Sequence, residues 1–371
     1  MKILILANSD VGLYKFRKEL LQELLHPGTV INGRKAQPCK IYIAVPDGDY
    51  LYSIKKMGCK VIKTPMDRRG TNPVKDLKLV NLYRIAVNKI KPDFVLTYTI
   101  KPNIYGGILC ILKKIKYIPN ITGLGTSIEN GDFMSKVILF MYKISMSKSN
   151  TVFFQNEKNK KFFEDNKIRK KGYVLPGSGV NLDENKYEEY PENNEKLRFL
   201  FVGRIMKDKG IEEFLECAEY IKKKYPSTCF DILGDYDEDV YRSRVERLHK
   251  DGVINYYGQQ DDVHSFMITH HATILPTYHE GLSNVLLESA ATGRPVIATN
   301  IPGCQEAFDD GITGIGFEPR NKEALIKAVE KFITMPYEEK RKMGFAAREK
   351  VSREFDRKIV IKAYLDAMMI Q

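Results

Sequence analysis

The sequence predicts an α/β protein built from two doubly wound parallel sheets. Three observations support this: short apolar runs alternate with helical patterns from end to end, most of these runs are continuous, and one polar stretch divides the series. Continuous apolar runs are typical of strands that helices cover on both faces. The βαβα alternation indicates parallel strands, and 371 residues fit two domains of ordinary size.

The predicted strands form two series along the chain. The first consists of Lys2–Ala7, Ile41–Val45, Phe94–Tyr98, Thr151–Gln155 and Tyr173–Leu175. The second consists of Leu197–Val202, Cys229–Leu233, Val253–Tyr257, Ala272–Leu275 and Pro295–Thr299. A helix is expected at Ile211–Lys224, where the apolar residues fall on one stripe, and a long helical tail at about 336–369.

The domain boundary is placed at the polar stretch Asp183–Lys196, which we interpret as a linker. Residues 1–182 then form the first domain and residues 183–354 the second, and we expect the C-terminal helix, about 355–371, to pack back on the first. Two facing domains of this kind would place the carboxyl ends of both sheets at a central cleft, where such sheets bind ligands.

Composition excludes several classes of protein. With a mean hydropathy of −0.33, 21 Tyr and 18 Phe, the chain has enough apolar side chains to form hydrophobic cores. This excludes a mainly disordered protein. The longest clean apolar run, Val137–Tyr142, is too short to span a bilayer, and the N-terminus is interpreted as a first strand, not a signal peptide. The six Cys are far apart, which suits a reducing cytoplasm.

Charge is divided unevenly between the two halves. Residues 1–182 hold 32 basic and 13 acidic residues, a net +19, whereas the rest holds 27 and 34, a net −7. A strongly basic half indicates an anionic partner: nucleic acid, an anionic membrane surface or a phosphorylated substrate. The alternative is a set of lysine-rich solvated faces.

Two loops after predicted strands carry the residues with the clearest chemistry. In the first, Arg204 and Lys209 stand five apart and can converge on one pyrophosphate; a solvated basic loop is the alternative. In the second, Glu280 precedes a helix whose first amides can hold a phosphate. Glu288, on that helix, has apolar neighbours and could accept both hydroxyls of a ribose, unless it is a surface carboxylate.

These motifs resemble those of glycosyltransferase family 4. The pattern is G-R-x4-K-G, then H-E-G-L-S-N-V-L-L-E, then G-x-P-V-I-A, and it covers essentially all of residues 183–354. That family consists of retaining enzymes of the GT-B fold, with two Rossmann-like domains, that use nucleotide sugars. The stretches N-S-D-V-G-L-Y-K-F-R, T-I-K-P-N and I-T-G-L-G-T-S resemble a bacterial branch that extends polyprenyl-diphosphate-linked saccharides for surface polysaccharides or glycans.

The resemblance implies a role for each residue of the two loops. Arg204 and Lys209 would hold the nucleotide diphosphate and neutralise the leaving group, Glu288 would bind the ribose, and Glu280 would contact the transferred sugar. The backbone amides of Leu282 and Ser283 would hold the phosphate. The other donor-binding residues that it implies are Gly12, in the loop after the first strand, and Gly258, Gln259, Gln260, Gly281 and Asn284.

Acceptor-binding candidates lie in the first domain. Lys101 follows the strand Phe94–Tyr98 and could pair with a phosphate. Arg17 and Lys15, near the start of the first helix, are weaker candidates, with a plain surface helix as the alternative. The glycine turn with Gly123, Gly125 and Thr126 could hold an anion or a sugar. The chain departs from many members of the family in having a single Gly at position 12 and no His in 121–127, so we assign no His-assisted role there.

Two other motifs suggest metal sites that we do not adopt. Asp235, Asp237 and Asp239 form D-x-D-x-D, but the Gly and Glu of a calcium loop are missing, so we interpret the run as a solvated loop. His270 and His271 have no third ligand nearby, and a core or capping role is expected. We therefore predict no metal and no cofactor beyond the nucleotide-sugar donor.

The leading hypothesis is a retaining, metal-independent glycosyltransferase. It would move a hexose or N-acetylhexosamine from a UDP-sugar to a polyprenyl-diphosphate-linked saccharide, at the inner face of the cytoplasmic membrane. The alternatives are a nucleotide-sugar epimerase of the same fold and a basic nucleic-acid-binding protein, although no nucleic-acid-binding module is apparent. The stripe of Val137, Phe140, Met141 and Ile144 would either lie on a membrane or pack internally.

Overall fold

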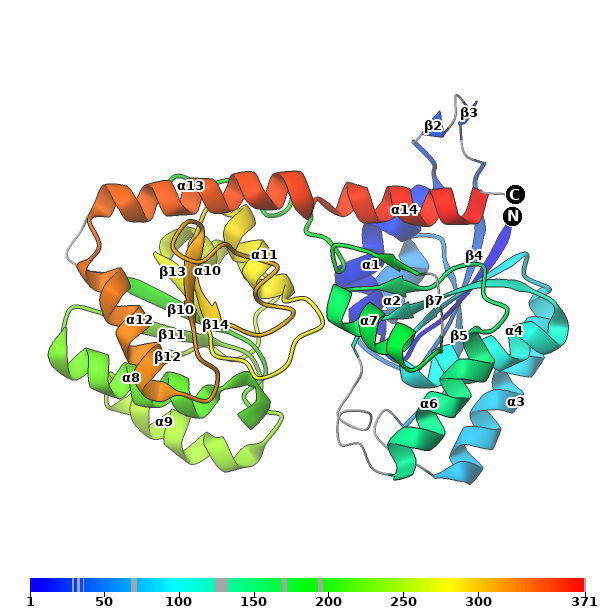
Figure 1. Cartoon of the computed structure of the whole chain (residues 1–371), viewed down its shortest axis with the longest axis horizontal. Coiled ribbons are helices and arrows are strands. Elements are labelled where there is room, and N and C mark those ends of the chain that lie inside the picture. Colours follow the sequence, from blue (N-terminus) through cyan, green and yellow to red (C-terminus); the bar gives the residue numbers. More distant parts are fainter. Residues whose placement is uncertain are drawn as a thin grey trace. The chain divides into compact units, whose positions relative to one another are not determined.

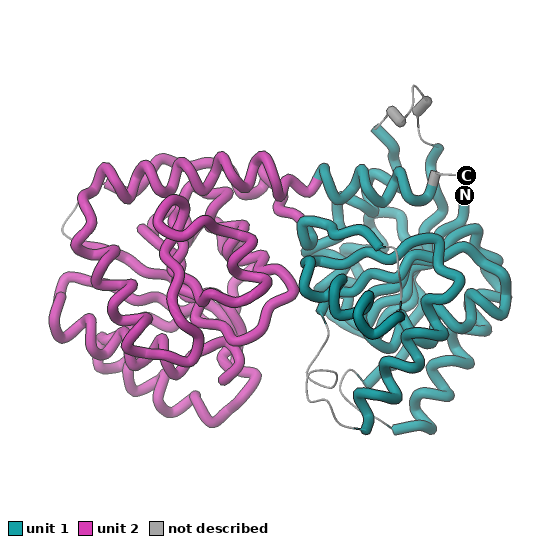
Figure 2. The backbone as a smooth tube through the Cα atoms, in the orientation of Figure 1, with its two compact units in different colours: residues 1–178, 358–371 teal, residues 179–357 magenta. Residues whose placement is uncertain are grey.

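The protein is described by a computed structural model that covers residues 1–28, 30–31, 34–35, 37–67, 72–123, 133–168, 172–192 and 196–369. The chain divides into two compact units, coloured separately in Figure 2. Unit 1 comprises residues 1–178 and 358–371, and unit 2 comprises residues 179–357. The chain therefore passes twice from one unit to the other.

Unit 1 is built on a seven-stranded parallel sheet in the order β5-β4-β1-β6-β7-β8-β9. Its strands are β1 (Lys2–Leu6), β4 (Lys40–Val45), β5 (Lys60–Lys63), β6 (Phe94–Tyr98), β7 (Lys116–Ile121), β8 (Phe153–Phe154) and β9 (Tyr173–Val174). Strands β2 (Val30–Ile31) and β3 (Arg34–Lys35) form a separate antiparallel pair. The central strands are buried on both faces, as continuous apolar runs predict.

The helices of unit 1 pack on both faces of this sheet (Figure 1). They are α1 (Asp10–Leu25), α2 (Leu51–Lys56), α3 (Pro73–Ile90), the π-helical turn η1 (Pro102–Gly106) that runs into α4 (Gly107–Lys113), α6 (Phe133–Met146), α7 (Glu157–Asp165) and α14 (Arg357–Met369). Side-chain caps start three of them, since Ser9, Asn72 and Asn156 accept hydrogen bonds from the first-turn amides of α1, α3 and α7.

Unit 2 contains a six-stranded parallel sheet in the order β12-β11-β10-β13-β14-β15. Its strands are β10 (Arg198–Val202), β11 (Cys229–Leu233), β12 (Asn255–Tyr256), β13 (Ala272–Leu275), β14 (Val296–Thr299) and β15 (Gly314–Phe317). Its helices are α8 (Ile211–Lys224), α9 (Arg242–Lys250), α10 (His264–Thr269), α11 (Asn284–Ala291), α12 (Lys322–Thr334) and α13 (Tyr337–Glu354), with short 3-10 turns η2 (Lys207–Lys209) and η3 (Asp239–Tyr241).

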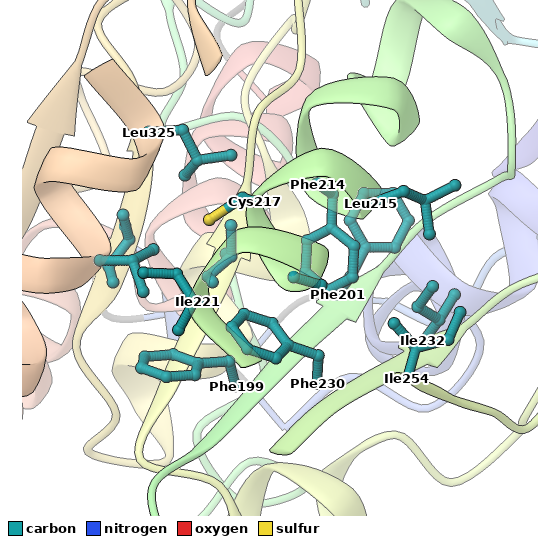
Figure 3. Packing of buried hydrophobic residues seen from close by; sticks show 14 of the residues in the cluster. Phe199, Phe201, Phe214, Leu215, Cys217, Ile221, Phe230, Ile232, Ile254 and Leu325 are labelled. Carbon is teal, nitrogen blue, oxygen red and sulfur yellow. The ribbon is translucent and has the colours of Figure 1, made fainter. Parts of the chain in front are cut away.

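Aromatic rings fill the core of unit 2 between its sheet and α8 (Figure 3). The Phe199 and Phe230 rings of adjacent strands stack with their centroids 5.1 Å apart, and Phe201 meets Phe214 of α8 at the same distance. Large buried rings of this kind contribute strongly to the hydrophobic stabilisation of a core. This core fixes α8, and with it the loop that precedes α8.

Both sheets reverse strand order at one point, between β1 and β6 in unit 1 and between β10 and β13 in unit 2. Doubly wound sheets bind ligands in the crevice outside the carboxyl ends of the strands at such a switch point. The predicted fold class, two doubly wound parallel sheets, is confirmed, and α8 begins and ends where the sequence places it.

The structure also differs from the sequence-based elements in three places. Strands β5, β7 and β15 were not predicted; β7 contains Pro119, which interrupts its apolar pattern and cannot donate to the ladder. The helical tail is two helices, because the backbone leaves the helical conformation at Phe355. The expected linker packs on unit 2, where the buried Tyr190 hydroxyl donates to the His271 carbonyl at 2.9 Å.

The C-terminal helix α14 packs into the core of unit 1, where Val360, Tyr364, Leu365 and Met368 are buried beside strand residues such as Phe153. In the described ranges, no helix combines the length and the apolar character that crossing a bilayer requires.

Candidate active site

The loops that follow β10 and β13 are joined at the switch point of unit 2. Gly210 has φ +70°, and a Cβ there would collide with the Pro276 carbonyl, so only glycine allows this approach. The Tyr278 amide and the Thr277 hydroxyl both donate to the Asp208 carbonyl, at 2.8 and 3.1 Å. The two loops that the sequence singled out therefore form one continuous surface.

Lys209 and Glu280 form an ion pair across this surface. The Lys209 Nζ lies 2.5 Å from the Glu280 Oε1, and the side chains are only 20% and 15% exposed. The sequence predicted both residues as site residues but not their pairing. Because the pair is partly shielded from water, it holds the ammonium group in one position, as a preorganised diphosphate site needs.

Arg204 lies on the same loop and is more exposed. Its Nη1 is 3.1 Å from the Asp237 Oδ2, and Asp239 pairs with Arg242 at 2.9 Å. Two carboxylates of the D-x-D-x-D run are thus ion-pair partners of arginines: Asp239 is solvated, as the sequence predicted, whereas Asp237 is partly shielded from water. In the residues that the structure describes, no group of three or more His, Cys, Asp or Glu could hold a metal ion.

The loop between Glu280 and α11 is fixed by the glycine after β14. Gly303 has φ +90°, and a Cβ there would collide with the backbone and Cβ of Glu280. The Ser283 amide donates to the Gly303 carbonyl at 2.8 Å, and the Ser283 hydroxyl caps α11. A phosphate would therefore have to compete with the Gly303 carbonyl for the Ser283 amide, and the expected contact stays a prediction. Leu282 is buried in the adjoining core, and Gly281, between Glu280 and Leu282 in the sequence, is half-buried.

Helix α11 presents Asn284 and Glu288 four residues apart, on one face of the helix. Both residues are half-buried. The Asn284 Oδ1 is buried without a hydrogen-bond partner among the described residues, and buried polar atoms of that kind usually have a partner. This face therefore offers a carboxylate and an amide to a polar ligand.

The segment after β12 lies beside the loops that follow β10 and β11. The Gly234 amide donates to the Gly258 carbonyl at 2.9 Å, and the positive φ of Gly234 brings it against the Gly203 carbonyl. Gly258 has φ +67° with open space around its Cα. Gln260 donates to the Tyr257 carbonyl at 2.7 Å. Gln259, between them, stays a predicted donor contact.

Sequence reasoning missed the support of the second loop by Tyr278. Its hydroxyl donates to the Glu213 Oε1 at 2.5 Å, and the Arg320 guanidinium lies 4.8 Å from its ring centre. Burial, and then Glu213, raise the pKa of Tyr278. Glu213 and Arg320 are 65 and 42 residues from Tyr278 in the sequence, so no local pattern signals either contact.

His270 and His271 are structural residues, as predicted. The His270 Nε2 lies 2.9 Å from the Asp231 Oδ2, and the His271 Nδ1 accepts the Arg198 amide. Burial lowers the pKa of His271 to about 4, so this ring is neutral at ordinary pH. Burial alone would raise the pKa of Asp231, but hydrogen bonds from His270, Asn255 and Arg198 lower it.

Three of the unit 1 predictions need correction or comment. Gly12 is not in a loop: it lies in the first turn of α1, and its amide donates to the Ser9 hydroxyl at 3.3 Å. Lys101 is not a free cation, because its Nζ pairs with Asp76 at 2.6 Å, with both side chains largely buried. Arg17 is not on a surface face of α1 but is buried.

Asn103, the last residue of the T-I-K-P-N motif, takes part in a buried hydrogen-bond network of unit 1. The Thr97 hydroxyl donates to the Asn103 Oδ1 at 2.6 Å, and the Asn103 Nδ2 donates to the Asn120 carbonyl at 2.8 Å. The Asn120 Nδ2 in turn donates to the Tyr364 hydroxyl of α14.

Gly123 has open space around its Cα, and Gly125 and Thr126 lie outside the described residues.

Two protein-family models match the chain. The model described as Glycosyl transferases group 1 matches residues 183–350, and that described as Glycosyl transferase 4-like matches residues 2–156. Among curated proteins, an N,N'-diacetylbacillosaminyl-diphospho-undecaprenol alpha-1,3-N-acetylgalactosaminyltransferase of Campylobacter jejuni is 25% identical over 98% of this chain and 97% of its own length. The capsular polysaccharide biosynthesis glycosyltransferase CapM of Staphylococcus aureus is 27% identical over 86% of this chain and 87% of its own.

Solved structures resemble the whole chain. Anabaena HepE in complex with UDP has a TM-score of 0.78 at 15% identity and covers 99% of both chains. The sucrose-phosphate synthase of Thermosynechococcus elongatus has a TM-score of 0.77 at 17% identity, covering 99% of this chain and 98% of its own. At these identities, the likeness shows a common fold.

Proposed function

We propose that this chain, which belongs to the group 1 glycosyltransferases and has the GT-B fold, is a sugar transferase of surface-glycan synthesis. It transfers a hexose or N-acetylhexosamine from a UDP-sugar to a polyprenyl-diphosphate-linked saccharide. The observation that carries the donor part is the placement of two basic side chains, Arg204 and Lys209, after β10 at the switch point of unit 2, each in an ion pair with a carboxylate. The names of the Campylobacter relative and of the HepE complex support the acceptor and the UDP moiety.

The proposed reaction retains the configuration at the sugar. Negative charge grows on the departing diphosphate, and Arg204 and Lys209 would stabilise it in the transition state. The Lys209–Glu280 pair would place Glu280 against the sugar, where its carboxylate orients the ring and stabilises the developing cation. The leaving phosphate itself would take the proton of the acceptor hydroxyl, on the same face of the sugar.

Activity is expected to persist in excess EDTA. In the described ranges Asp237 and Asp239 of the acidic run pair with arginines, and no group of three or more His, Cys, Asp or Glu could hold a metal ion. Arg204 and Lys209 would supply the positive charge that a divalent ion provides in other transferases. The measurement is transfer after dialysis against EDTA, with and without added Mg²⁺ or Mn²⁺. Complete loss that either ion restores would contradict metal independence.

The membrane part of the proposal rests on α6. Ser135, Tyr142, Ser145 and Met146 of this helix are buried in unit 1, and Ile138 and Leu139 pack partly buried beside them. The apolar stripe that the sequence singled out is divided: Phe140 is 64% exposed and Ile144 is also exposed, whereas Met141 packs on the core of unit 1 and Val137 is half-buried. Phe133, at the start of the helix, is 80% exposed. The exposed part of the helix surface, with Phe133, Phe140 and Ile144, is the part available to a membrane.

A neighbouring groove extends this apolar face. It has a volume of about 370 Å³ and is lined by α3 and α6 residues that include Leu77, Val80, Met134 and Val137. Exposed apolar patches flanked by Lys, here Lys136 and Lys143, suit an interfacial helix on an anionic surface. We place the chain, as a proposal, at the inner face of the cytoplasmic membrane.

One experiment tests acceptor and membrane together. The chain should sediment with anionic vesicles and less with neutral ones, and moderate salt should weaken the attachment, because exposed charges are screened. In parallel, transfer from a panel of UDP-sugars is measured to a polyprenyl-diphosphate-linked saccharide and to the same free saccharide. Preference for the lipid-linked acceptor is expected. Equal partitioning to both vesicle types with equal transfer to the free sugar would contradict the proposal, and conversion of the UDP-sugar alone would indicate an epimerase.

A further inference from the structure

Arg17 is a buried cation in unit 1. It lies on the inward face of α1 with 4% of its surface exposed. Its guanidinium carbon is 5.3 Å from the centre of the Tyr98 ring, at the carboxyl end of β6. Its Nη1 donates to the carbonyl of the preceding residue, Phe16, at 2.8 Å. The side chain thus reaches from α1 to the switch point of the sheet.

The charge of Arg17 has no acidic partner. No carboxylate in the described ranges pairs with it, and its Nε is buried without a hydrogen-bond acceptor. Lys101, the other predicted cation at this edge, pairs with Asp76. Arginine is rarely buried unless it is paired, since an uncompensated charge in the interior is costly. An arginine kept in this state fits a site whose counter-charge comes from a ligand.

Thr99, the residue after Tyr98, carries a second sign of a binding site. It has φ +72°, a conformation that strongly disfavours β-branched side chains. Its Oγ1 is buried and, like the Arg17 Nε, has no hydrogen-bond partner in the described part of the chain. This residue directly follows Tyr98, over whose ring the Arg17 guanidinium lies, so both unsatisfied groups belong to the carboxyl end of β6. Strain of this kind persists chiefly where function requires it.

We propose that Arg17, with Thr99, forms a phosphate-binding subsite in unit 1, and that its ligand is the diphosphate of the lipid-linked acceptor. The identity of that ligand rests on the proposed function, whereas the existence of an oxyanion site does not. Arg supplies a planar fork of donors that suits phosphate oxygens, and a hydroxyl can add one further bond. A small shift of the side chain on binding would give the guanidinium its missing acceptors.

The test uses Arg17→Met in the full chain, with inorganic pyrophosphate as the probe and saturating UDP present to occupy the donor site. Pyrophosphate should raise the melting temperature of the wild-type protein, and this shift should be lost in the variant. Without ligand, Arg17→Met should melt about 2–4 °C higher than the wild type, because it removes an uncompensated buried charge. A purely structural arginine would instead melt lower when replaced.

Transfer kinetics identify the source of the phosphate. In Arg17→Met the KM for the lipid-linked acceptor should rise at least tenfold, while the KM for the UDP-sugar changes less than twofold; Arg17→Lys should fall between the two. Arg84→Met is the matched control, since Arg84 is exposed on α3 and bonds only Asn81 among the described residues. It should behave as wild type in both assays.

The outcomes separate the two proposals. If pyrophosphate raises the melting temperature of the wild type but not of Arg17→Met, and the wild type transfers no sugar, the anion site is supported and the proposed function is overturned. Normal transfer with an unchanged acceptor KM, or an equal pyrophosphate shift in wild type and variant, would overturn the Arg17 subsite and leave the function standing. A rise in the donor KM alone would assign the phosphate to the nucleotide and overturn the acceptor assignment.

Discussion

Replacing Arg204 or Lys209 by Ala is expected to lower kcat/KM for sugar transfer by about 10²–10³-fold, the usual cost of removing one preorganised group that stabilises developing negative charge. Lys209→Ala also leaves Glu280 partly buried without its partner, 2.5 Å away in the native pair. Arg204 is more exposed and shares its charge with Asp237, so its loss should fall at the lower end of that range.

The effect on the donor is measured by steady-state transfer and by UDP affinity from calorimetry. Glu288→Gln tests the ribose contact and should weaken UDP-sugar binding more than tenfold, or about 1.5–3 kcal/mol for a charge-assisted hydrogen bond. Lys207→Ala is the matched control: it is an exposed lysine of the same loop, and its backbone amide still donates to Glu238 in the variant. Near-wild-type transfer by both Arg204→Ala and Glu288→Gln would contradict the site.

Replacing Arg294 by Met is expected to destabilise unit 2 by about 3–5 kcal/mol, which is typical when a buried polar network loses its central group. Arg294 is 1% exposed. Its guanidinium donates to backbone carbonyls of three separate segments, those of Met267, Ile268, Glu188, Glu189, Thr292 and Gly293. Methionine fills similar space but leaves these carbonyls buried without donors.

Thermal and urea unfolding measure this effect, with a fall in Tm of roughly 6–20 °C expected for a domain of this size. Burial lowers the pKa of Arg294 to about 10, so the side chain stays charged at neutral pH and the effect should hold there. Arg341→Met, at an exposed arginine of α13 paired with Glu338, should change stability by less than about 0.5 kcal/mol. Equal stability of the two variants would show that the carbonyl network contributes nothing.

The parts of the structure that local pattern determines could be predicted from the sequence. The apolar runs located β6, β11 and β13, and the amphipathic stripe located α8, because burial on a sheet leaves a direct mark on residue order. Strand β7 could not be found, since Pro119 breaks its pattern while neighbouring strands hold it in place.

Side-chain pairing over long sequence distances could not be predicted. Lys101 looked like a free cation because its partner, Asp76, stands 25 residues earlier on another helix. A charged side chain predicts an exposed position, so Arg17 was expected on the surface of the first helix, although it lies on the buried face of α1. In the predicted donor site, the loops and their residue types were predictable. The hydrogen bond from the Ser283 amide to the Gly303 carbonyl was not, because it depends on how the loop after β14 folds back against the loop after β13.

The two crossings of the chain between units have a consequence for biosynthesis. Unit 2 is one continuous segment, whereas unit 1 also needs the C-terminal helix α14. Tyr364 and Leu365 of this helix are part of the core of unit 1, and the Tyr364 hydroxyl accepts a hydrogen bond from the Asn120 side chain. During translation the N-terminal sheet therefore emerges long before the helix that covers part of its apolar surface, and such surface is prone to aggregation. Unit 2, encoded later, can reach its native state first. We therefore expect the order of folding to be the reverse of the order of synthesis, with the nascent N-terminal sheet as a client for a ribosome-associated chaperone.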